Sequence, residues 1–562
     1  MGERILNRMD RKLSNEAFKL LEFLVEHKEI FSKNFSAGTI SHWKSKLRAS
    51  YINPLLEELS DFSLIKKCNE GIFRVPKYTL NLDEIEEFLD AKEDSIYTQE
   101  YRDALEDEIK KYNKFVITTA VMGKEINEPF VNSIRNYAKR NNALLLVLPC
   151  EDVASRGKKA SSIELSSELN DFKVVFKDTY INKNLCLSAI KVSAKQINSL
   201  TGLDRLVTSR NASIIMASPK VFLKYVPNMH YDIPHAIMST GAITNNNYDT
   251  EKYMSKKVSV LAENDHTFGA VLVEVEDENI FHFRHVQASP YNSLTDMGVD
   301  YLPDGSVKNM ESTVMVVGDS HVGYHDEDLY WTTLKTAREI GVSYMVLHDI
   351  FNGTSITHHD KGKGITRAIK AKENKLSLEL EFKAIRNYLD NIEKHDMDIY
   401  IVESNHDQHL TRYLEEGRYI TDPINYQTSL KLALAVFEKR NPLQYAIENL
   451  LNHKSDRIHW LKEDESFNVY GVELSIHGSK GSNGSRGSLQ AFERGLGNCV
   501  TAHSHTACII RNAFSVGTTS QMDMDYNRGL SNWTRTCCLI YNNGTKQLIN
   551  FIPKGKEYKC RV

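Results

Sequence analysis

Long hydrophobic runs are absent from this sequence of 562 residues. No apolar stretch approaches the roughly 20 residues that a helix needs to cross a bilayer. The first residues, Met1 to Leu6, also lack the apolar core of a secretory signal peptide. We therefore expect a protein of the cytoplasm that has no membrane partner.

An excess of one sign of charge is also missing. The chain carries 70 Lys and Arg residues against 74 Asp and Glu residues, which gives a formal net charge of -4. A strongly basic chain would have indicated nucleic acid directly. Without that excess, binding to a polyanion requires a local basic patch on the surface.

Cysteine pairs with the spacing of a metal site or a disulfide framework are lacking as well. None of the eight cysteines stands in a C-x-x-C pair, and their spacing resembles neither a zinc finger nor a disulfide-rich module. This usage favours a reducing cytoplasm. The length is sufficient for three or four domains with large cores.

Residues 1–85 predict a small helical unit. Its expected elements are a helix from Ser14, a helix over residues 40–49, a helix that starts at Pro54, and a hairpin of residues 64–67 with 71–75. This order is typical of a winged helix-turn-helix, whose second helix would face a DNA groove with Lys44 and Lys46. A helical interaction or oligomerisation module with a solvated basic face explains the same residues equally well.

Two further regions precede the part of the chain that contains the candidate metal ligands. Residues 86–111 are rich in Asp, Glu and Lys and predict a charged helical connector. Residues 112–308 predict an α/β domain, because the strand–helix–strand pattern over residues 115–119, 127–140 and 143–148 requires a parallel sheet. No phosphate-binding glycine motif marks this domain. Its predicted role is a scaffold or a subunit contact, and a homo-oligomer through this domain and the N-terminal unit is an expected assembly.

Residues 309–562 contain five predicted strands that each end in side chains able to bind a metal. The junctions are Asp319 and His321 after strand 314–317, Asp349 after 343–347, Asn405, His406 and Asp407 after 398–403, His477 after 472–476, and His503 and His505 after 499–502. In sheets built from βα units, functional groups gather outside the carboxyl ends of the strands. Carboxylate oxygens combined with imidazole nitrogens suit a divalent transition metal. The sequence therefore predicts a metal site in this region.

The ordered set Asp-x-His, Asp, Asn-His-Asp, His and His-x-His resembles the calcineurin-like metallophosphoesterases. The resemblance implies that residues 309–562 form an α/β sandwich of two packed sheets flanked by helices. Three glycines of the family pattern are replaced, by His348, Ser404 and Ala502. The Gly- and Ser-rich run over residues 477–492 is most similar to phage-encoded members, the early nucleases with which large siphophages destroy host DNA.

The resemblance also implies two metal sites. One ion would be held by Asp319, His321, Asp349 and His505. The other would be held by Asp349, Asn405, His477 and His503. A carboxylate shared by both sites, that of Asp349, would offset the repulsion between two dications, and the neutral amide of Asn405 would keep the ions electrophilic. Oxygen and imidazole ligands without thiolate favour two Mn²⁺ ions, with Mg²⁺, Fe or Zn²⁺ as alternatives.

Other residues near the motifs are expected to act on the substrate. His406 is the predicted proton donor to the leaving oxygen, or a group that stabilises charge on the phosphoryl group. Asp407 is predicted to orient a neighbouring imidazole. Basic side chains that follow two of the ligand loops would bind the backbone of a polyanion; these are Lys361, Lys363, Arg367, Lys480 and Arg486.

Three functions are compatible with these residues. The first is a metal-dependent DNase, encoded by a phage, which binds and degrades host DNA in the bacterial cytoplasm. The second is a phosphomonoesterase or cyclic-nucleotide phosphodiesterase with the same metal centre. The third is a DNA-binding regulator with an inactive phosphoesterase domain. The complete ligand set argues against the third, and the large N-terminal extension argues against a minimal small-molecule phosphatase.

Overall fold

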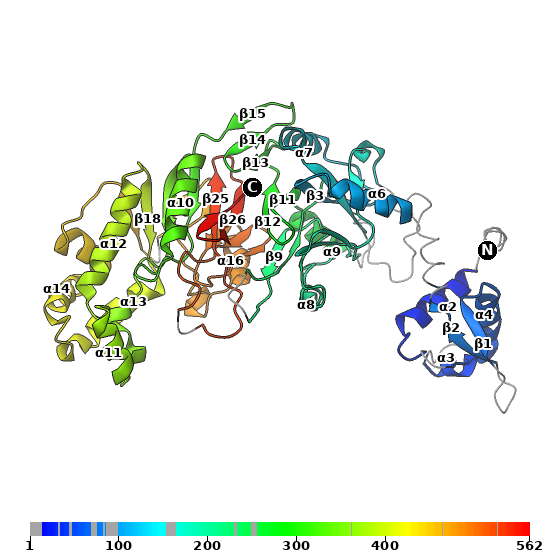
Figure 1. Ribbon diagram of the computed structural model, residues 1–562, viewed down its shortest axis with the longest axis horizontal. Helices are drawn as coiled ribbons and strands as arrows, with labels where there is room; N and C mark the ends of the chain where they lie inside the picture. The colour runs from blue at the N-terminus through cyan, green and yellow to red at the C-terminus, as the bar shows by residue number, and fades with distance from the viewer. Residues whose placement is uncertain are drawn as a thin grey trace. The chain divides into compact units, whose positions relative to one another are not determined.

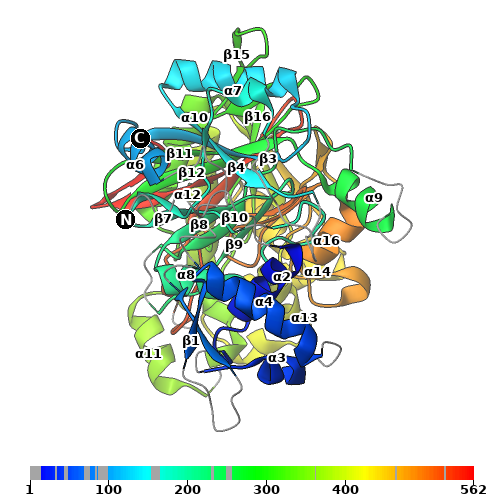
Figure 2. The ribbon, with the colours of Figure 1, turned by 90° about the vertical axis from the view of Figure 1, so that its right-hand side faces the viewer.

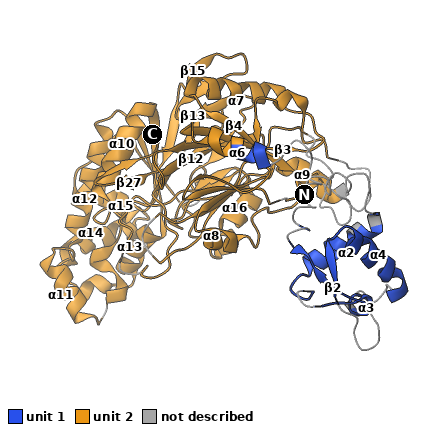
Figure 3. Ribbon diagram, turned by 45° about the vertical axis from the view of Figure 1, so that its right-hand side comes forward, with its two compact units in different colours: residues 1–103, 155–163 blue, residues 104–154, 164–562 orange. Residues whose placement is uncertain are grey.

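The ribbon in Figure 1 and Figure 2 is a computed structural model of the whole chain. The structure describes residues 14–31, 34–43, 48–68, 76–82, 85, 99–152, 165–190, 192–229, 233–248, 256–360, 362–462, 465–524 and 527–562. Several predictions fall outside these ranges, namely the hairpin arm 71–75, the recognition residues Lys44 and Lys46, residues 86–98 of the connector, and Lys361. The chain divides into two compact units, residues 1–103 with 155–163 and residues 104–154 with 164–562 (Figure 3).

The first unit contains three helices and a two-stranded antiparallel sheet. Its elements are α2 (Asn15–Glu26), α3 (Ala37–Trp43), α4 (Ala49–Asp61), β1 (Ile65–Cys68) and β2 (Lys77–Leu80). The Ser14 hydroxyl caps α2 by accepting from Ala17 N at 3.2 Å, and it donates to Glu58 Oε2 of α4 at 2.7 Å. The predicted order of three helices and a hairpin is therefore confirmed within the described residues.

One detail of that prediction was wrong. Helix α4 begins at Ala49, so Pro54 lies inside it and not at its first position. The predicted hairpin arm 71–75 lies outside the described residues, and the strand that the structure pairs with β1 is β2. Tyr78 of β2 is buried and exchanges backbone hydrogen bonds with Phe35 at 2.9 and 2.8 Å. The long-range pairing with Phe35 has no local sequence signal.

A five-stranded sheet opens the second unit. Its order is β12 (Phe281–Gln287), β11 (Gly269–Val275), β3 (Lys114–Val121), β4 (Leu144–Cys150) and β5 (Lys173–Val174). Strands β3 and β4 are parallel and are joined by α7 (Glu128–Asn141), which packs along this sheet (Figure 2). Asn127 caps that helix through its Oδ1, which accepts from Phe130 N at 3.2 Å. The predicted βαβ unit is confirmed.

A ten-stranded sheet spans the predicted boundary after residue 308. Its order is β20 (Asn468–Val469), β21 (Val472–Glu473), β22 (Cys499–Thr501), β24 (Ala513–Ser515), β23 (Cys508–Ile510), β9 (Phe222–Tyr225), β10 (Ala236–Ser239), β8 (Ser213–Met216), β7 (Leu185–Ser188) and β6 (Thr179–Asn182). The junction is the antiparallel pair of β23 with β9, in which Ile509 faces Leu223. Residues 112–308 and 309–562 are thus joined through one sheet inside a single compact unit.

A six-stranded sheet forms the other half of the C-terminal region. Its order is β19 (Ile458–Leu461), β18 (Asp398–Val402), β17 (Val342–Leu347), β16 (Thr313–Val316), β25 (Thr536–Tyr541) and β26 (Lys546–Asn550). The first four strands are parallel. Helices α10 (Glu327–Ile340) and α12 (Leu378–Glu393) pack on it (Figure 1). The predicted apolar face of α12 is buried in the core, at Leu378, Phe382, Ile385, Leu389 and Ile392.

The remaining elements connect or flank these sheets. They are α6 (Gln99–Ile109), α8 (Asp204–Arg210), α9 (Lys256–Asp265), α11 (Gly364–Lys372), α13 (Asn405–Glu415), α14 (Tyr426–Phe437), α15 (Pro442–Tyr445), α16 (Leu489–Leu496), β13 (Leu294–Asp296), β14 (Val299–Tyr301), β15 (Val307–Asn309), β27 (Ile552–Lys554) and β28 (Glu557–Lys559). The described chain is therefore a mixed α/β protein with several sheets. Among its described helices, none is both long and apolar enough to cross a membrane.

Candidate metal centre

Five loops from two different sheets converge on one group of side chains. The loops after β16, β17 and β18 come from the six-stranded sheet, and those after β21 and β22 come from the ten-stranded sheet. The structure brings together the carboxylates and imidazoles of two overlapping groups, Asp319, His321, Asp349 and His505, and Asp349, His477 and His503. In each group the potential ligand atoms all lie within 4.8 Å of one another.

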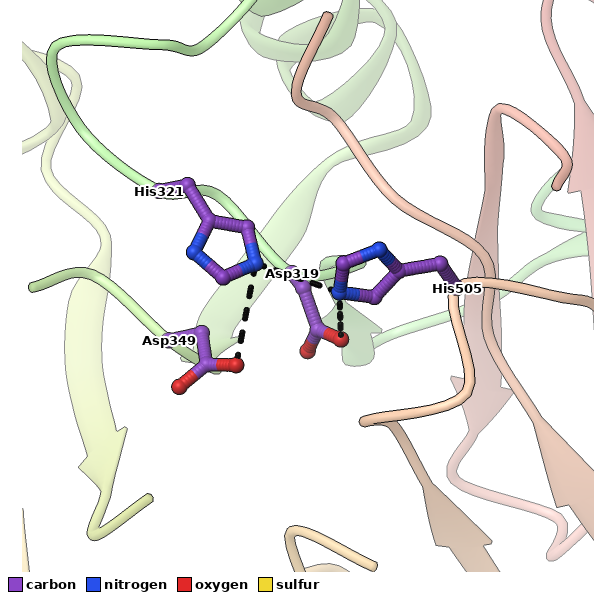
Figure 4. A group of neighbouring side chains, drawn as sticks. All are labelled: Asp319, His321, Asp349 and His505. Carbon is purple, nitrogen blue, oxygen red and sulfur yellow. Dashed lines mark hydrogen bonds and ion pairs between the residues drawn. The ribbon is translucent and has the colours of Figure 1, made fainter. Parts of the chain in front are cut away.

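In the first group the ligand atoms point toward a common centre (Figure 4). The Nε2 atoms of His321 and His505 face each other at 3.1 Å. Asp319 Oδ2 lies 3.0 Å from His505 Nε2, and Asp349 Oδ2 lies 3.7 Å from His321 Nε2. All four side chains are buried. This geometry can hold a single cation.

The second group shares one oxygen with the first. Asp349 Oδ2 lies 3.4 Å from His477 Nε2, so the same atom faces His321 and His477. Asn405 Oδ1 accepts a hydrogen bond from His477 Nε2 at 2.9 Å. The ring of His503 lies 5.1 Å from that of His477. The predicted ligand Asn405 thus lies beside the second group, and Asp349 has the position of a bridging residue.

Unpaired polar atoms show that the group is suited to a cation. Asp319 Oδ1 and Asp349 Oδ1 are buried and have no hydrogen-bond partner among the residues that the structure describes. Leaving a buried polar atom unpaired costs about 1–3 kcal/mol, and more when the group is charged. A bound divalent ion would satisfy these oxygens, and a donor set of carboxylates, an amide and imidazoles suits such an ion. The residues present therefore fit a metal.

The electrostatics of the buried group favour positive charge. Burial opposes ionisation of Asp319, but His505 and His477 beside it lower its pKa to about 2. Burial also opposes ionisation of Asp349, and His477 and His406 hold its pKa well below the ordinary value. Burial disfavours the charged form of His477, whereas Asp349 and Asp319 raise its pKa to about 9. The two carboxylates thus attract a cation at neutral pH.

Four of the converging residues have a left-handed backbone. The φ angles are 45° at His321, 46° at Asp349, 69° at His503 and 55° at His505. This region is uncommon for residues other than glycine, and such conformations persist where the surroundings impose them, often at functional sites. The backbone strain supports a functional role for these loops.

His348, Ser404 and Ala502, which stand where the resembled pattern has glycine, displace none of the predicted ligands. Ser404 caps α13, since its hydroxyl accepts from Asp407 N at 3.3 Å. Ala502 is buried. His348 is fully buried, stacks on His477 with 5.6 Å between ring centroids, and has no hydrogen-bond partner at either ring nitrogen. The sequence analysis identified His348 only as a replacement for glycine and predicted no role for its side chain.

A close approach of two chain segments encloses the first group. A Cβ added to Gly517 would lie 1.9 Å from Thr534 O, and one added to Gly318 would lie 2.6 Å from Gly517 O. Only glycine permits these contacts. They allow Thr518 Oγ1 to donate to Asp319 O at 2.7 Å, which fixes the backbone of the ligand loop.

His406 lies beside the first group with its ring orientation fixed. Its Nδ1 donates to Asn352 O at 2.9 Å, and its ring lies 4.8 Å from that of His321. The hydrogen bond at Nδ1 leaves Nε2 as the nitrogen that can exchange a proton with a substrate. This arrangement is compatible with the predicted role of proton donor.

The hydrogen bonds of Asp407 differ from its predicted role. Its Oδ2 accepts from Ser404 N at 2.9 Å, which completes a capping box at the start of α13. Because Asp407 is the third residue of the helix, its carboxylate reaches back to the N-cap and not to an imidazole. It therefore positions α13, from which Asn405 and His406 project. Burial raises the pKa of Asp407 to about 8, against the hydrogen bond from Ser404.

Glu381 of α12 is a positioning residue that the sequence did not indicate. Its Oε1 accepts from Thr354 N at 2.8 Å, and its Oε2 accepts from Ser355 N at 3.1 Å. These bonds fix the loop that follows Asp349 and carries Asn352. The contact joins two segments far apart in the sequence, so no local pattern predicted it.

The predicted substrate-binding residues are dispersed. Lys363 stands at the N-cap position of α11 without a capping side-chain hydrogen bond, and Arg367 lies within the helix; both are exposed. Lys480 lines a cleft of about 1160 Å³ together with His477. Arg486 is exposed, and its backbone forms a bridge to that of Lys480. Of the predicted basic residues that the structure describes, only Lys480 lines this cleft beside the metal centre.

The chain is similar to a protein of a bacteriophage. Protein A1 of Escherichia phage T5 is 27% identical over 474 residues, which cover 80% of this chain and 84% of Protein A1. No family model matches the sequence. Among solved structures, Chaetomium thermophilum Vps29 in complex with a RaPID-derived cyclic peptide covers 35% of this chain and 95% of its own, with 10% identity and a TM-score of 0.18. At that TM-score the similarity says nothing further about this fold.

Divalent metal should stabilise the second unit against unfolding. A ligand that binds only the folded state at a hundred times its dissociation constant adds about 2.7 kcal/mol per site. We expect added Mn²⁺ to raise the melting temperature and EDTA to reverse the rise, measured by differential scanning fluorimetry. Replacing Asp319 by Asn should reduce the rise, and replacing the surface residue Asp304 should not. An equal melting temperature with Mn²⁺ and with EDTA would contradict the metal site.

Proposed function

We propose that this chain is a two-metal phosphodiesterase that hydrolyses DNA. The observation that carries the proposal is the position of Asp349 Oδ2, which faces His321 Nε2 at 3.7 Å and His477 Nε2 at 3.4 Å. A carboxylate oxygen that both ligand groups share would offset the repulsion between two neighbouring dications. The sheets that supply the ligands accord with the metallophosphoesterase sandwich that the sequence resemblance implies.

Each residue of the proposed centre has a separate task. When bound, two neighbouring ions bind the phosphate oxygens and lower the pKa of water near the scissile bond. Asp349 would bridge the ions, and Asn405 would add an oxygen ligand without charge. His406 would hold a proton at Nε2 and release it to the leaving oxygen. The carbonyl of Asn352 keeps the His406 ring in the orientation for that transfer.

Three observations support DNA as the substrate. Protein A1, the similar protein, belongs to a phage, which fits a phage-encoded enzyme that acts on host DNA in the bacterial cytoplasm. The described residues of the first unit form three helices and a pair of antiparallel strands, an order found in DNA-binding modules. The cleft beside His477 carries several cations. The first unit, together with residues 112–308, would also provide the contacts of a homo-oligomer.

The test uses two substrates and three metal conditions. Purified protein is incubated with plasmid DNA and with bis(p-nitrophenyl) phosphate, each with Mn²⁺, Mg²⁺ or EDTA. We expect metal-dependent loss of intact DNA together with release of nitrophenol. Hydrolysis of the small ester with intact DNA would favour a small-molecule phosphatase or phosphodiesterase. Binding of DNA without hydrolysis of either substrate would favour an inactive regulator.

Deleting residues 1–85 should slow the degradation of long DNA without affecting the hydrolysis of a small phosphodiester. The buried core of this segment consists of its own residues, from Ala17 to Ile85, and those of its residues that the structure describes contribute no ligand to the metal centre. We expect the truncated protein to hydrolyse bis(p-nitrophenyl) phosphate like the full chain and to degrade long DNA more slowly. Both rates are measured on truncated protein that is folded, which is checked by comparing its melting temperature with that of the full chain. An equal loss of both activities would contradict this division.

A further inference from the structure

The cleft beside the second ligand group is larger than a site for a small molecule. Its volume is about 1160 Å³, and pockets for small ligands usually enclose about 300–1,000 Å³. It includes His477, a member of the second ligand group, and Glu403, and it extends along α13, the end of α14, α15 and β19. A polymer that crosses the metal centre could therefore continue into this cleft.

The charge of the cleft suits an anionic polymer. Five cationic side chains and three carboxylates line it, although the whole chain has a formal net charge of -4. In the described part of the chain, Lys439, Lys454 and Lys462 have no ion-pair partner, and all three are exposed. Exposed cations without a counter-charge, spread along one cleft, are suited to successive phosphates.

Two aromatic side chains in the same cleft are suited to bases. Tyr445 and Trp460 line it, and both are half-buried. The guanidinium of Arg440 lies over the Tyr445 ring at 4.4 Å, and Tyr445 also packs against the core, so the flat guanidinium is the surface that this pair offers to a base. The Trp460 Nε1 is shielded from solvent and has no hydrogen-bond partner. Rings of this kind bind unpaired bases by stacking.

We propose that this cleft binds a single-stranded stretch of the nucleic-acid substrate next to the scissile phosphate. Lys439, Lys454 and Lys462 contact its phosphates, and its bases stack on Trp460 and on the Arg440 guanidinium that covers Tyr445. The strand is unpaired because base faces inside a duplex already stack on each other and cannot reach a protein ring. This inference rests on the proposed function, since it assigns the kind of DNA that reaches the metal centre.

The binding test uses the full chain without metal, so that nothing is cleaved. Fluorescence anisotropy compares one labelled oligonucleotide as a single strand and as a blunt duplex over a series of salt concentrations. We expect tighter binding of the single strand. For Lys454→Gln with Lys462→Gln, the slope of log affinity against log salt should become smaller by about 1.4, since each lost contact to a single strand removes about 0.7. Lys335→Gln on α10 is the matched control and should keep the full slope.

A second pair of variants tests the stacking. Trp460→Ala should weaken binding of the single strand on the order of ten- to a hundredfold, as loss of one stacked base does. Trp460→Phe keeps a ring and should retain most of the affinity. Because Trp460 also packs against the core, thermal unfolding of both variants checks the fold, and the lysine variants decide the question if Trp460→Ala is unstable.

The outcomes separate this inference from the proposed function. Equal affinity for single strand and duplex, or a lysine double variant with an unchanged salt slope, overturns the cleft assignment even if the protein cleaves DNA. A protein that cleaves no DNA with any metal overturns the proposed function, while the anisotropy comparison still decides what the cleft binds. Selective loss of single-strand binding in both sets of variants supports the inference.

Discussion

Replacing Asp349 with alanine should abolish hydrolysis and reduce the metal bound at both ligand groups. Its Oδ2 is the only potential ligand atom of the described residues that the structure places in both groups, 3.7 Å from His321 Nε2 and 3.4 Å from His477 Nε2. Loss of a ligand to one ion would leave the other in place, whereas loss of the shared carboxylate weakens both. The measurements are metal content by mass spectrometry and the rate on plasmid DNA.

Two control variants make the Asp349 result interpretable. Asp349→Asn keeps the size of the side chain and an oxygen ligand but removes the charge, so it should retain more metal than the alanine variant. His503→Ala affects only the second group and should leave the metal of the first. Two bound ions per chain in the Asp349→Ala protein would reject the bridging position.

Replacing His406 with alanine should slow the cleavage of DNA by about 10²- to 10⁴-fold, which is the typical contribution of general acid catalysis to a reaction rate. His406 is outside both ligand groups, and its Nδ1 is engaged with Asn352 O at 2.9 Å. The variant should therefore bind metal and DNA nearly as well as the parent protein. The loss should be smaller on bis(p-nitrophenyl) phosphate, because nitrophenolate leaves without being protonated.

His409 provides the matched control for His406. It lies on the same helix, and its ring is 5.2 Å from that of His406. His409→Ala should change the single-turnover rates on both substrates by less than the His406 variant does. A His406 variant that loses metal, or that slows equally on DNA and on the small ester, would show that His406 stabilises structure or charge and is not the acid.

Local patterns in the sequence were sufficient for the elements around the metal centre. Apolar runs predicted β16, β17, β18 and β22 to within one or two residues, because a buried strand must be apolar on both faces. The three-and-four spacing of Leu378, Phe382, Ile385 and Leu389 predicted the buried face of α12. The order of ligand-type residues at strand ends predicted which side chains meet.

One difference from the predictions is local, and another depends on how distant segments pack. Asp407 was predicted to orient an imidazole, and its hydrogen bond goes to Ser404 N, since helix geometry directs the third residue back to the N-cap. Lys363 and Arg367 follow a ligand loop in sequence but do not line the cleft, whereas Lys439 and Lys462 do. Proximity to a motif in sequence does not determine which surface faces the site.

The sequence by itself predicted the fold class and the type of site. The order of Asp, Asn and His at strand ends, the lack of cysteine ligands and the alternation of strands and helices predicted an α/β protein with a metal centre. Only the tertiary structure decided that β23 pairs with β9 across the predicted domain boundary, and that one oxygen of Asp349 faces two groups. The physical reason is that periodicity and capping act over a few residues, whereas strand partners and shared ligands depend on how the whole chain packs.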